Sequence, residues 1–139
     1  GQVASLQHRP GLYFDLSGLE NLRLLASLVG RPLAAADAHA LLDSVGLPRE
    51  AHGRRVRHYS RGMQQRTGLA RIIASGATTW LLDEPSTGLD PDGRATLARV
   101  LREAVDQGVA VLAISHDPEL LALADRHLHL HDGRLHEVT

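Results

Sequence analysis

Two adjacent carboxylates follow an apolar run in this sequence. The run TTWLLD (78–83) has the length and continuous apolar character of a strand buried on both faces of a parallel sheet. Its carboxyl end presents Asp83 and Glu84, whose side chains diverge and can take different tasks. The first suits Mg²⁺ held through water, and the second suits a general base for an attacking water. The alternative to a catalytic pair is an acidic pair in a surface turn. The position at the end of a strand favours the catalytic interpretation.

A histidine follows a second apolar run. VAVLAIS (109–115) is predicted to be another buried strand, and His116 comes directly after it. If the two runs are neighbours in one sheet, His116 lies at the same edge as Asp83 and Glu84. An imidazole there can contact a terminal phosphate or orient water. A lone His is more often structural or solvated, but the shared edge favours a functional group.

A helix start suited to an anion lies between these runs and the N-terminus. HYSRGMQQRTGLARIIASG (58–76) predicts a helix that begins at Ser60 and ends near Gly76. Backbone N–H groups and the helix dipole favour an anion at such a start. An ordinary N-cap explains Ser60. An N-cap does not explain Gly62 in the first turn, where Gly destabilises the helix by about 1 kcal/mol relative to Ala. Close approach of a ligand to the backbone would explain a Gly there.

The elements that must position these groups predict an α/β fold. The first half of the chain is mostly helical, whereas the second half alternates strands and helices, which is typical of a parallel sheet with functional loops at the carboxyl ends of its strands. The other predicted elements are a strand at 2–7, a loop at 8–18, helices at 19–30 and 33–47, a polar connection at 48–59, helices at 91–108 and 117–124, and a hairpin at 126–138.

Local signals set several of these boundaries. Ser17 and Glu20 have the spacing of a capping box at the start of the first helix. Asp90 or Asp92 is placed to cap the helix at 91–108. The period of the first helix predicts one apolar face, made of Leu19, Leu22, Leu25 and Leu28.

The C-terminal alternation around Asp132-Gly133 is a strong hairpin signal. Its period of two places four histidines on one face, a set that could bind Zn²⁺ or Ni²⁺. No carboxylate that would orient the rings is evident, which favours a plain polar outer face. The four are His127, His129, His131 and His136, and the predicted inner face consists of Leu128 and Leu130.

Composition excludes several classes of protein. The 139 residues fit one domain, and a net charge of −1 gives no general basis for binding nucleic acid. The absence of Cys excludes disulfides and thiol catalysis. No apolar run approaches the roughly 20 residues that span a bilayer. All 15 basic residues are Arg. The chain has no initiator Met and opens in what resembles the end of a strand, so we expect it to begin partway through a larger domain.

Three stretches of the sequence resemble motifs of ATP-binding cassette (ABC) proteins, in the same order and spacing. The signature motif is matched by YSRGMQQR, the Walker B motif with its D-loop by WLLDEPSTGLD, and the switch-histidine loop by AISHD. The resemblance implies a partial P-loop NTPase-like α/β sheet with a helical subdomain and a C-terminal β-hairpin. It makes residues 1–139 a partial ABC ATPase domain. Residues 8–18 would be the Q-loop region, 19–76 the helical subdomain with the signature motif, and 77–139 the remainder.

The resemblance assigns roles to the strand-end residues. Walker B places Mg²⁺ support on Asp83 and the general base on Glu84, and the switch histidine that contacts the γ-phosphate falls on His116. The cofactors implied are therefore ATP and Mg²⁺. They would be bound by the complete protein.

The resemblance also assigns contacts between subunits. Signature residues Ser60 and Gly62 would bind the γ-phosphate of ATP held by the opposite subunit, and Asp90 of the D-loop would reach across the dimer. The Q-loop Gln position falls on His8, with Gln7 adjacent, and both are candidates for its role. The sequence also departs from the common signature pattern, because Arg61 and Met63 replace its Gly and Gln.

The form SRGMQQR and the His in the Q-loop resemble the haem-exporter-like and ABC-2-type exporter branches. The implied function is the C-terminal part of a cytoplasmic ATPase subunit, peripheral to the inner face of the cell membrane. Its partners would be a transmembrane permease and a second ATPase subunit. A soluble ABC protein of translation or repair, and a non-catalytic module that offers its signature helix to a complete cassette, are the alternatives.

The chain lacks the lysine of a phosphate-binding loop. A P-loop has the pattern G-x-x-x-x-G-K-[ST], whose Lys reaches the β- and γ-phosphates, and this sequence has no Lys. In the family the P-loop precedes the Q-loop. We therefore expect residues 1–139 alone neither to bind ATP tightly nor to hydrolyse it.

Overall fold

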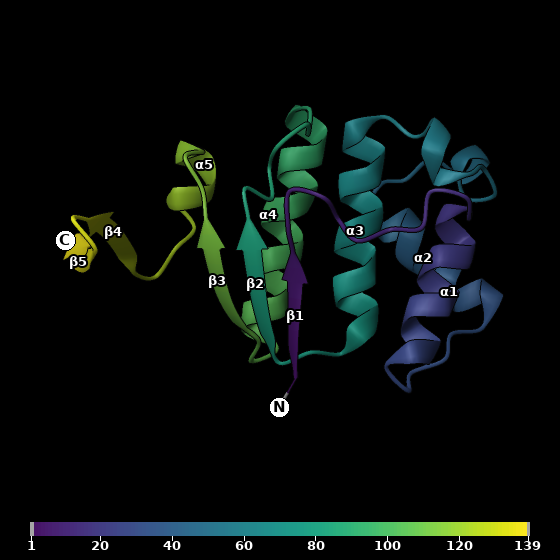
Figure 1. The fold of residues 1–139 in the computed structure, drawn as a ribbon, viewed down its shortest axis with the longest axis horizontal. Coiled ribbons are helices and arrows are strands. Elements are labelled where there is room, and N and C mark those ends of the chain that lie inside the picture. The colour runs from purple at the N-terminus through teal and green to yellow at the C-terminus, as the bar shows by residue number, and fades with distance from the viewer. Residues whose placement is uncertain (1, 139) are drawn as a thin grey trace.

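Three parallel strands and a group of helices make up most of the computed structural model, which describes residues 2–138 (Figure 1). A separate two-stranded hairpin lies at the C-terminal end. The strands and helices are β1 (Val3–Leu6), α1 (Gly18–Leu28), α2 (Ala35–Ser44), α3 (Arg61–Ser75), β2 (Thr79–Asp83), α4 (Pro91–Asp106), β3 (Ala110–Ile114), α5 (Pro118–Leu121), β4 (His127–His131) and β5 (Arg134–Val138), and short 3₁₀ turns occupy Arg49–Ala51 and Val56–His58.

The sheet has the strand order β1-β2-β3, and both pairings are parallel. Leu6 pairs with Leu82, and Asp83 pairs with Ile114, so the carboxyl ends of the three strands meet at one edge. The predicted α/β class with a parallel sheet is confirmed. The neighbouring position of β2 and β3, on which the placement of His116 beside Glu84 depends, is confirmed as well.

Helix α3 joins the sheet to the other helices. It packs against β1 on one side and against α1 and α2 on the other, whereas α4 contacts β3 and α3. Figure 1 shows α1 and α2 set apart from the sheet, with α3 between them. One continuous core runs through these layers, and its largest fully buried apolar side chains are Leu6, Leu22, Leu42, Leu47, Ile72, Val45 and Val56.

The sheet is covered on only one face in the described chain. Trp80 and Leu82 are buried against the helices, whereas Leu81 between them is exposed. In β3, Leu112 is 58% exposed and Ile114 is exposed as well. The prediction that both apolar runs are buried on two faces is therefore wrong for this chain, because no element among residues 2–138 covers the second face.

Helix α1 starts as predicted but faces the core differently. Ser17 Oγ accepts from Glu20 N at 3.0 Å and Glu20 Oε2 accepts from Ser17 N at 2.9 Å, so the capping box is confirmed. Leu22 and Ala26 are buried, but Leu28 in the last turn is exposed, because the chain leaves the core there. The four-leucine face is therefore wrong at its C-terminal end.

Other boundaries shift by a few residues. The second helix begins at Ala35 rather than 33, since Ala34, the residue before it, has an extended backbone. The predicted helix at 117–124 shortens to α5. The connection at 48–59 is less polar than expected, because its 3₁₀ turns bury Ala51 and Val56.

The hairpin forms as predicted, with positive φ at both turn residues, Asp132 (φ 47°) and Gly133 (φ 73°), as a type I′ turn requires. Its predicted inner face is wrong, because Leu128 and Leu130 are both exposed. Among residues 2–138, no group of three His, Cys, Asp or Glu side chains is arranged to hold a metal ion. None of the helices within this range combines the length and hydropathy that a bilayer crossing requires.

Two histidine rings pack together beside α2. The Nδ1 atoms of His39 and His52 are 2.7 Å apart, and the ring centroids are 5.0 Å apart. His52 is buried, and its Nε2 lies 3.0 Å from the Leu47 carbonyl oxygen. Because a carbonyl only accepts, a neutral His52 ring donates from Nε2 and accepts at Nδ1. His39 is therefore the donor of the short contact.

Acid is expected to weaken this histidine pair. Desolvation lowers the pKa of His39, the nearby Arg49 and His52 lower it further, and Asp43 raises it. An imidazole with a lowered folded-state pKa binds protons more readily when unfolded. Its contribution to stability is therefore present above the unfolded pKa of about 6.5 and is lost as the pH falls below that value. Urea unfolding at about pH 7.5 and about pH 5.5 measures the loss.

The variant His39→Gln is expected to lose less unfolding free energy between these two pH values than the unsubstituted chain. His136→Gln, on the exposed hairpin, is the matched control and is expected to behave like the unsubstituted chain. An unchanged pH dependence in His39→Gln would contradict the prediction.

Candidate functional site

The carboxyl edge of the sheet brings most of the predicted site residues together. Gln7 and His8 follow β1, Asp83 ends β2 with Glu84 after it, and His116 follows β3 by two residues. Because Leu6 pairs with Leu82 and Asp83 with Ile114, these positions lie level with one another across the three strands. Figure 1 shows the arrowheads of β1, β2 and β3, which mark their carboxyl ends, at the same edge of the sheet.

Glu84 is half-buried and has an uncommon backbone conformation. Its φ is +47°, in the left-handed region, and the next residue is Pro85. Its N–H donates to the Ile114 carbonyl at 2.8 Å, and its carbonyl accepts from Thr87 N–H at 3.1 Å. Such strain costs about 1–3 kcal/mol, persists only where the surroundings hold it, and gathers at functional sites.

His116, predicted at the same edge, lies close to Glu84. His116 Nε2 is 3.6 Å from Glu84 Oε1, and the imidazole is 95% exposed whereas the carboxylate is 31% exposed. The ring is therefore free to turn toward a ligand above the edge without breaking a buried contact. A carboxylate beside an imidazole can accept a proton from water and be oriented by the ring.

Asp83 ends β2 beside Glu84 with its side chain exposed at the open edge. Carboxylate oxygens are the ligands that Mg²⁺ prefers, and an exposed carboxylate leaves room for the waters that Mg²⁺ retains. The residues at this edge therefore fit a magnesium ion.

The start of α3 is held by the residue before its cap. Ser60 Oγ accepts from Met63 N–H at 3.2 Å, which confirms Ser60 as the N-cap. Tyr59 is buried. Its hydroxyl donates to the Ala51 carbonyl at 2.5 Å and accepts from Gly18 N–H at 3.1 Å. Burial raises the pKa of Tyr59, so the hydroxyl keeps its proton. The side chain anchors the helix start to α1.

Gly62 has a structural explanation that the sequence did not reveal. A Cβ at Gly62 would lie 2.9 Å from the backbone oxygen of Gly88, closer than a side-chain carbon tolerates. Gly88 itself has φ +79° and packs under the Arg61 side chain. A ligand is therefore not needed to explain Gly62, since close approach of the loop after Glu84 explains it as well.

The Asp90 side chain is bound by groups of the same chain. Its Oδ1 accepts from Gly93 N–H at 2.8 Å, which makes it the N-cap of α4, and from Arg66 Nη2 at 3.2 Å. Arg66 also donates from Nη1 to the Val45 carbonyl at 2.9 Å. Asp90, rather than Asp92, is therefore the cap, and it is joined to the helical region through Arg66.

The two candidates for the Q-loop position differ in their contacts. Both ring nitrogens of His8 lie 3.0 Å from Arg61 Nη2, and its carbonyl oxygen lies 3.4 Å from the same atom. Gln7 is exposed. The structure thus connects His8 with the residue that replaces a glycine in the common signature pattern.

Asn21 is a structural residue that no motif in the sequence predicted. It is fully buried, and its Oδ1 accepts from Tyr13 N–H at 2.7 Å. Its Nδ2 lies 2.9 Å from the carbonyl oxygens of both Tyr13 and Ser17, and 3.4 Å from that of Leu16. One side chain therefore fixes the loop at 8–18 to α1. The one sequence feature that could have identified Asn21 is its position, because it is a polar residue directly before Leu22 of the predicted apolar helix face.

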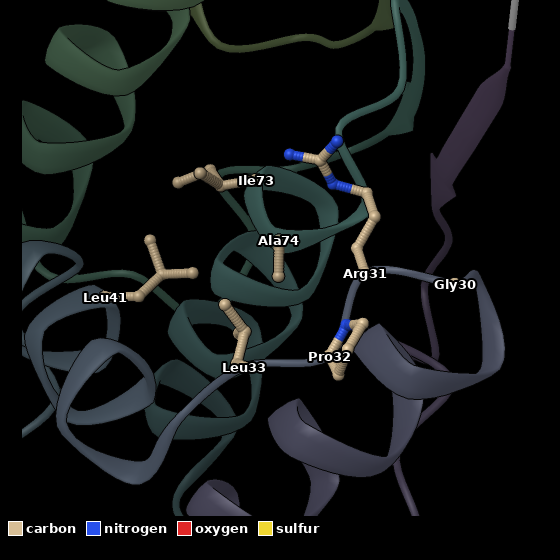
Figure 2. A pocket seen from close by; sticks show the side chains of 7 residues that line it. All are labelled: Gly30, Arg31, Pro32, Leu33, Leu41, Ile73 and Ala74. Atoms are coloured by element: carbon tan, nitrogen blue, oxygen red, sulfur yellow. The ribbon is translucent and has the colours of Figure 1, made fainter.

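A hollow of about 480 Å³ lies at the opposite end of the helical region (Figure 2). It is formed where α1 has ended and α3 is ending, so it is remote from the start of α3 and from the strand ends. Arg31 supplies its only charged side chain, and the other lining residues are Gly30, Pro32, Leu33, Leu41, Ile73 and Ala74. It contains no acid or base that could take part in hydrolysis.

Residues 1–87 match the ABC transporter family. The chain is 36% identical over 141 residues to the cytochrome c biogenesis ATP-binding export protein CcmA of Alcanivorax borkumensis, with 99% of this chain and 60% of CcmA covered. It is 36% identical to the ribose import ATP-binding protein RbsA of Pseudomonas putida, with 93% of this chain and 27% of RbsA covered. It is 39% identical to the pyoverdine export ATP-binding/permease protein PvdT of Pseudomonas syringae pv. tomato, with 84% of this chain and 18% of PvdT covered. The chain thus spans less than two thirds of each.

The fold is also similar to solved structures. A dimeric structure of the ATP-binding cassette MJ0796, in a post-hydrolysis state bound to ADP and Pi, superposes with a TM-score of 0.87 at 23% identity. The comparison covers 98% of this chain and 62% of that one. The fold and the sequence matches agree, and the chain belongs to the ABC transporter family as an ATP-binding domain.

Proposed function

We propose that this chain is the C-terminal part of the ATP-hydrolysing subunit of an ABC transporter, which couples ATP binding and hydrolysis to a membrane permease. The observation that carries the proposal is the meeting of Asp83, Glu84 and His116 at one sheet edge in a chain of this family. The helix start at Ser60, on α3, would contribute to the corresponding site of a second subunit.

The hydrolytic step needs a base, and Glu84 suits it. Its carboxylate takes a proton from the water that attacks the γ-phosphate, and His116, at 3.6 Å, orients that water or contacts the phosphate. Asp83 would hold Mg²⁺ at the edge. The metal, when bound, supplies positive charge that offsets the charge developing on the phosphate oxygens.

The signature helix serves the opposite subunit in this proposal. Two subunits would dimerise head to tail, so that Ser60 and Gly62 of one bind the γ-phosphate of ATP held by the other, with Asp90 crossing the dimer. The free backbone N–H groups and the dipole at the start of α3 support an anion there. The similar fold of the MJ0796 cassette, described as dimeric with ADP and Pi, supports the same arrangement.

Residues 1–139 by themselves are proposed to be inactive. Tight binding of the β- and γ-phosphates in P-loop proteins uses a lysine, and these residues contain none. ATP hydrolysis is therefore to be measured on the gene product, that is, the protein as expressed from its own gene.

The permease is proposed to dock on the loop at 8–18. Tyr13 and Phe14 are half-exposed aromatic side chains on a loop to which Asn21 hydrogen-bonds, and exposed aromatics are typical of interfaces. The subunit would then lie at the cytoplasmic face of the membrane. The named relatives include export proteins, CcmA and PvdT, and an import protein, RbsA, and the SRGM signature favours export.

Co-purification tests this assignment. The tagged gene product, extracted with mild detergent from its own host, is expected to carry a membrane permease with it. Replacing Tyr13 and Phe14 together by Ala should remove the permease, whereas Leu28→Ala, at an exposed position elsewhere, should retain it. Ribosomes in place of a permease would point to the translation alternative and contradict the transport assignment.

A further inference from the structure

Gln65 makes a buried contact that no predicted role explains. It lies on α3, five residues after Ser60, and is 6% exposed. Its Nε2 donates to the Pro85 carbonyl oxygen at 2.8 Å, across twenty positions of sequence. Pro85 is itself fully buried and directly follows Glu84. The bond therefore joins the signature helix to the backbone beside the proposed base.

The conformation of Glu84 needs this kind of support. A residue before proline is restricted to extended backbone by clashes with the proline ring, yet Glu84 has φ +47°. A non-glycine residue in this region persists only when its surroundings hold it. Two of the holding bonds, to Ile114 and from Thr87, are made by backbone groups. The bond from Gln65 holds the next peptide and is the one that a side-chain substitution removes.

We infer that Gln65 is a positioning residue for hydrolysis, which holds the Glu84–Pro85 backbone so that the Glu84 carboxylate stays beside His116. The inference rests on the proposed function of Glu84 as base. Gln65 touches neither His116 nor the carboxylate and acts only through the Pro85 carbonyl. Its amide is well suited to the task because it is uncharged in a buried place and donates along a fixed direction.

The neighbouring glutamine offers a matched control. Gln64 lies one residue earlier on α3, is less buried, and its Nε2 is 3.4 Å from the Tyr59 carbonyl. Gln65→Met keeps the length of the side chain and removes the donor. In the gene product we expect Gln65→Met to lower kcat for ATP hydrolysis about 10- to 100-fold with little change in KM. Gln64→Met should leave both within about 2-fold.

Hydrogen exchange gives a readout that does not depend on activity. The backbone amides of Glu84 and of residues 86–90 should exchange faster in Gln65→Met, and in Gln65→Glu as a second variant, but not in Gln64→Met. Unchanged exchange in both Gln65 variants would overturn the inference whatever the activity.

A double-mutant cycle separates positioning from general structural support. If Gln65 acts through Glu84, Gln65→Met should cause no further loss in a Glu84→Gln background. An equal loss in both backgrounds would overturn the inference. Full hydrolysis by Glu84→Gln alone, together with faster exchange in Gln65→Met, would instead overturn the proposed role of Glu84 and retain the contact as a determinant of loop structure.

Discussion

The substitution Glu84→Gln is expected to lower ATP hydrolysis by the gene product about 10²- to 10⁴-fold, the usual contribution of a general base. The amide keeps the size of the side chain but cannot take a proton from water. Because the substitution leaves Asp83 and Ser60 in place, ATP and Mg²⁺ should still bind. The measurements are steady-state phosphate release and equilibrium binding of labelled ATP.

Glu103→Gln is the matched control for this prediction. Glu103 is an exposed glutamate on α4 that pairs with Arg99, remote from the sheet edge. Its replacement should leave hydrolysis within about 2-fold of the unsubstituted protein, because surface substitutions away from a site have small effects. Phosphate release by Glu84→Gln at the rate of the Glu103→Gln control would rule out the base role.

The substitution Asn21→Leu is expected to lower the free energy of unfolding by about 2–4 kcal/mol. It removes the acceptor of the Tyr13 N–H and one of two donors to each of the Tyr13 and Ser17 carbonyls, which keep their backbone donors Leu16 N–H and Asn21 N–H. Leaving a buried polar group unpaired costs about 1–3 kcal/mol, and the lost bonds to the two carbonyls add to the loss at the Tyr13 N–H. The loop at 8–18 should also become more mobile. Urea unfolding gives the free energy, and hydrogen exchange of the loop amides gives the local effect.

The control for this prediction is Ser27→Ala, at an exposed position of the same helix, which should change stability by no more than about 0.5 kcal/mol. A loss in Asn21→Leu as small as in the control would show that water replaces the missing bonds. A stability loss without faster exchange in the loop would show that Asn21 supports α1 and not the loop.

Local signals in the sequence were sufficient for much of the fold. The capping box at Ser17, the cap at Ser60 and the hairpin turn at Asp132-Gly133 all appear where their residue types require them, since each depends on contacts within a few residues. The edge that carries Asp83 and Glu84 follows from an apolar strand of set length. These features need no knowledge of distant contacts.

Burial was harder to predict, because apolar character does not say what covers a side chain. Leu112 and Leu130 are as apolar as Leu22, but within residues 2–138 only Leu22 has elements packed over it. Leu28, in the last turn of α1, is exposed for the same reason, because no element among residues 2–138 packs over it.

The sequence alone determined the parallel α/β class, the order of the motifs and the residue types at the strand ends, because periodicity and spacing depend on the local chain. Only the tertiary structure revealed the left-handed backbone of Glu84, the bond from Gln65 to the Pro85 carbonyl, and the approach of Gly88 to Gly62. These contacts join segments about 20 residues apart or more. They arise from how helix α3 packs beside the sheet, which no local pattern encodes.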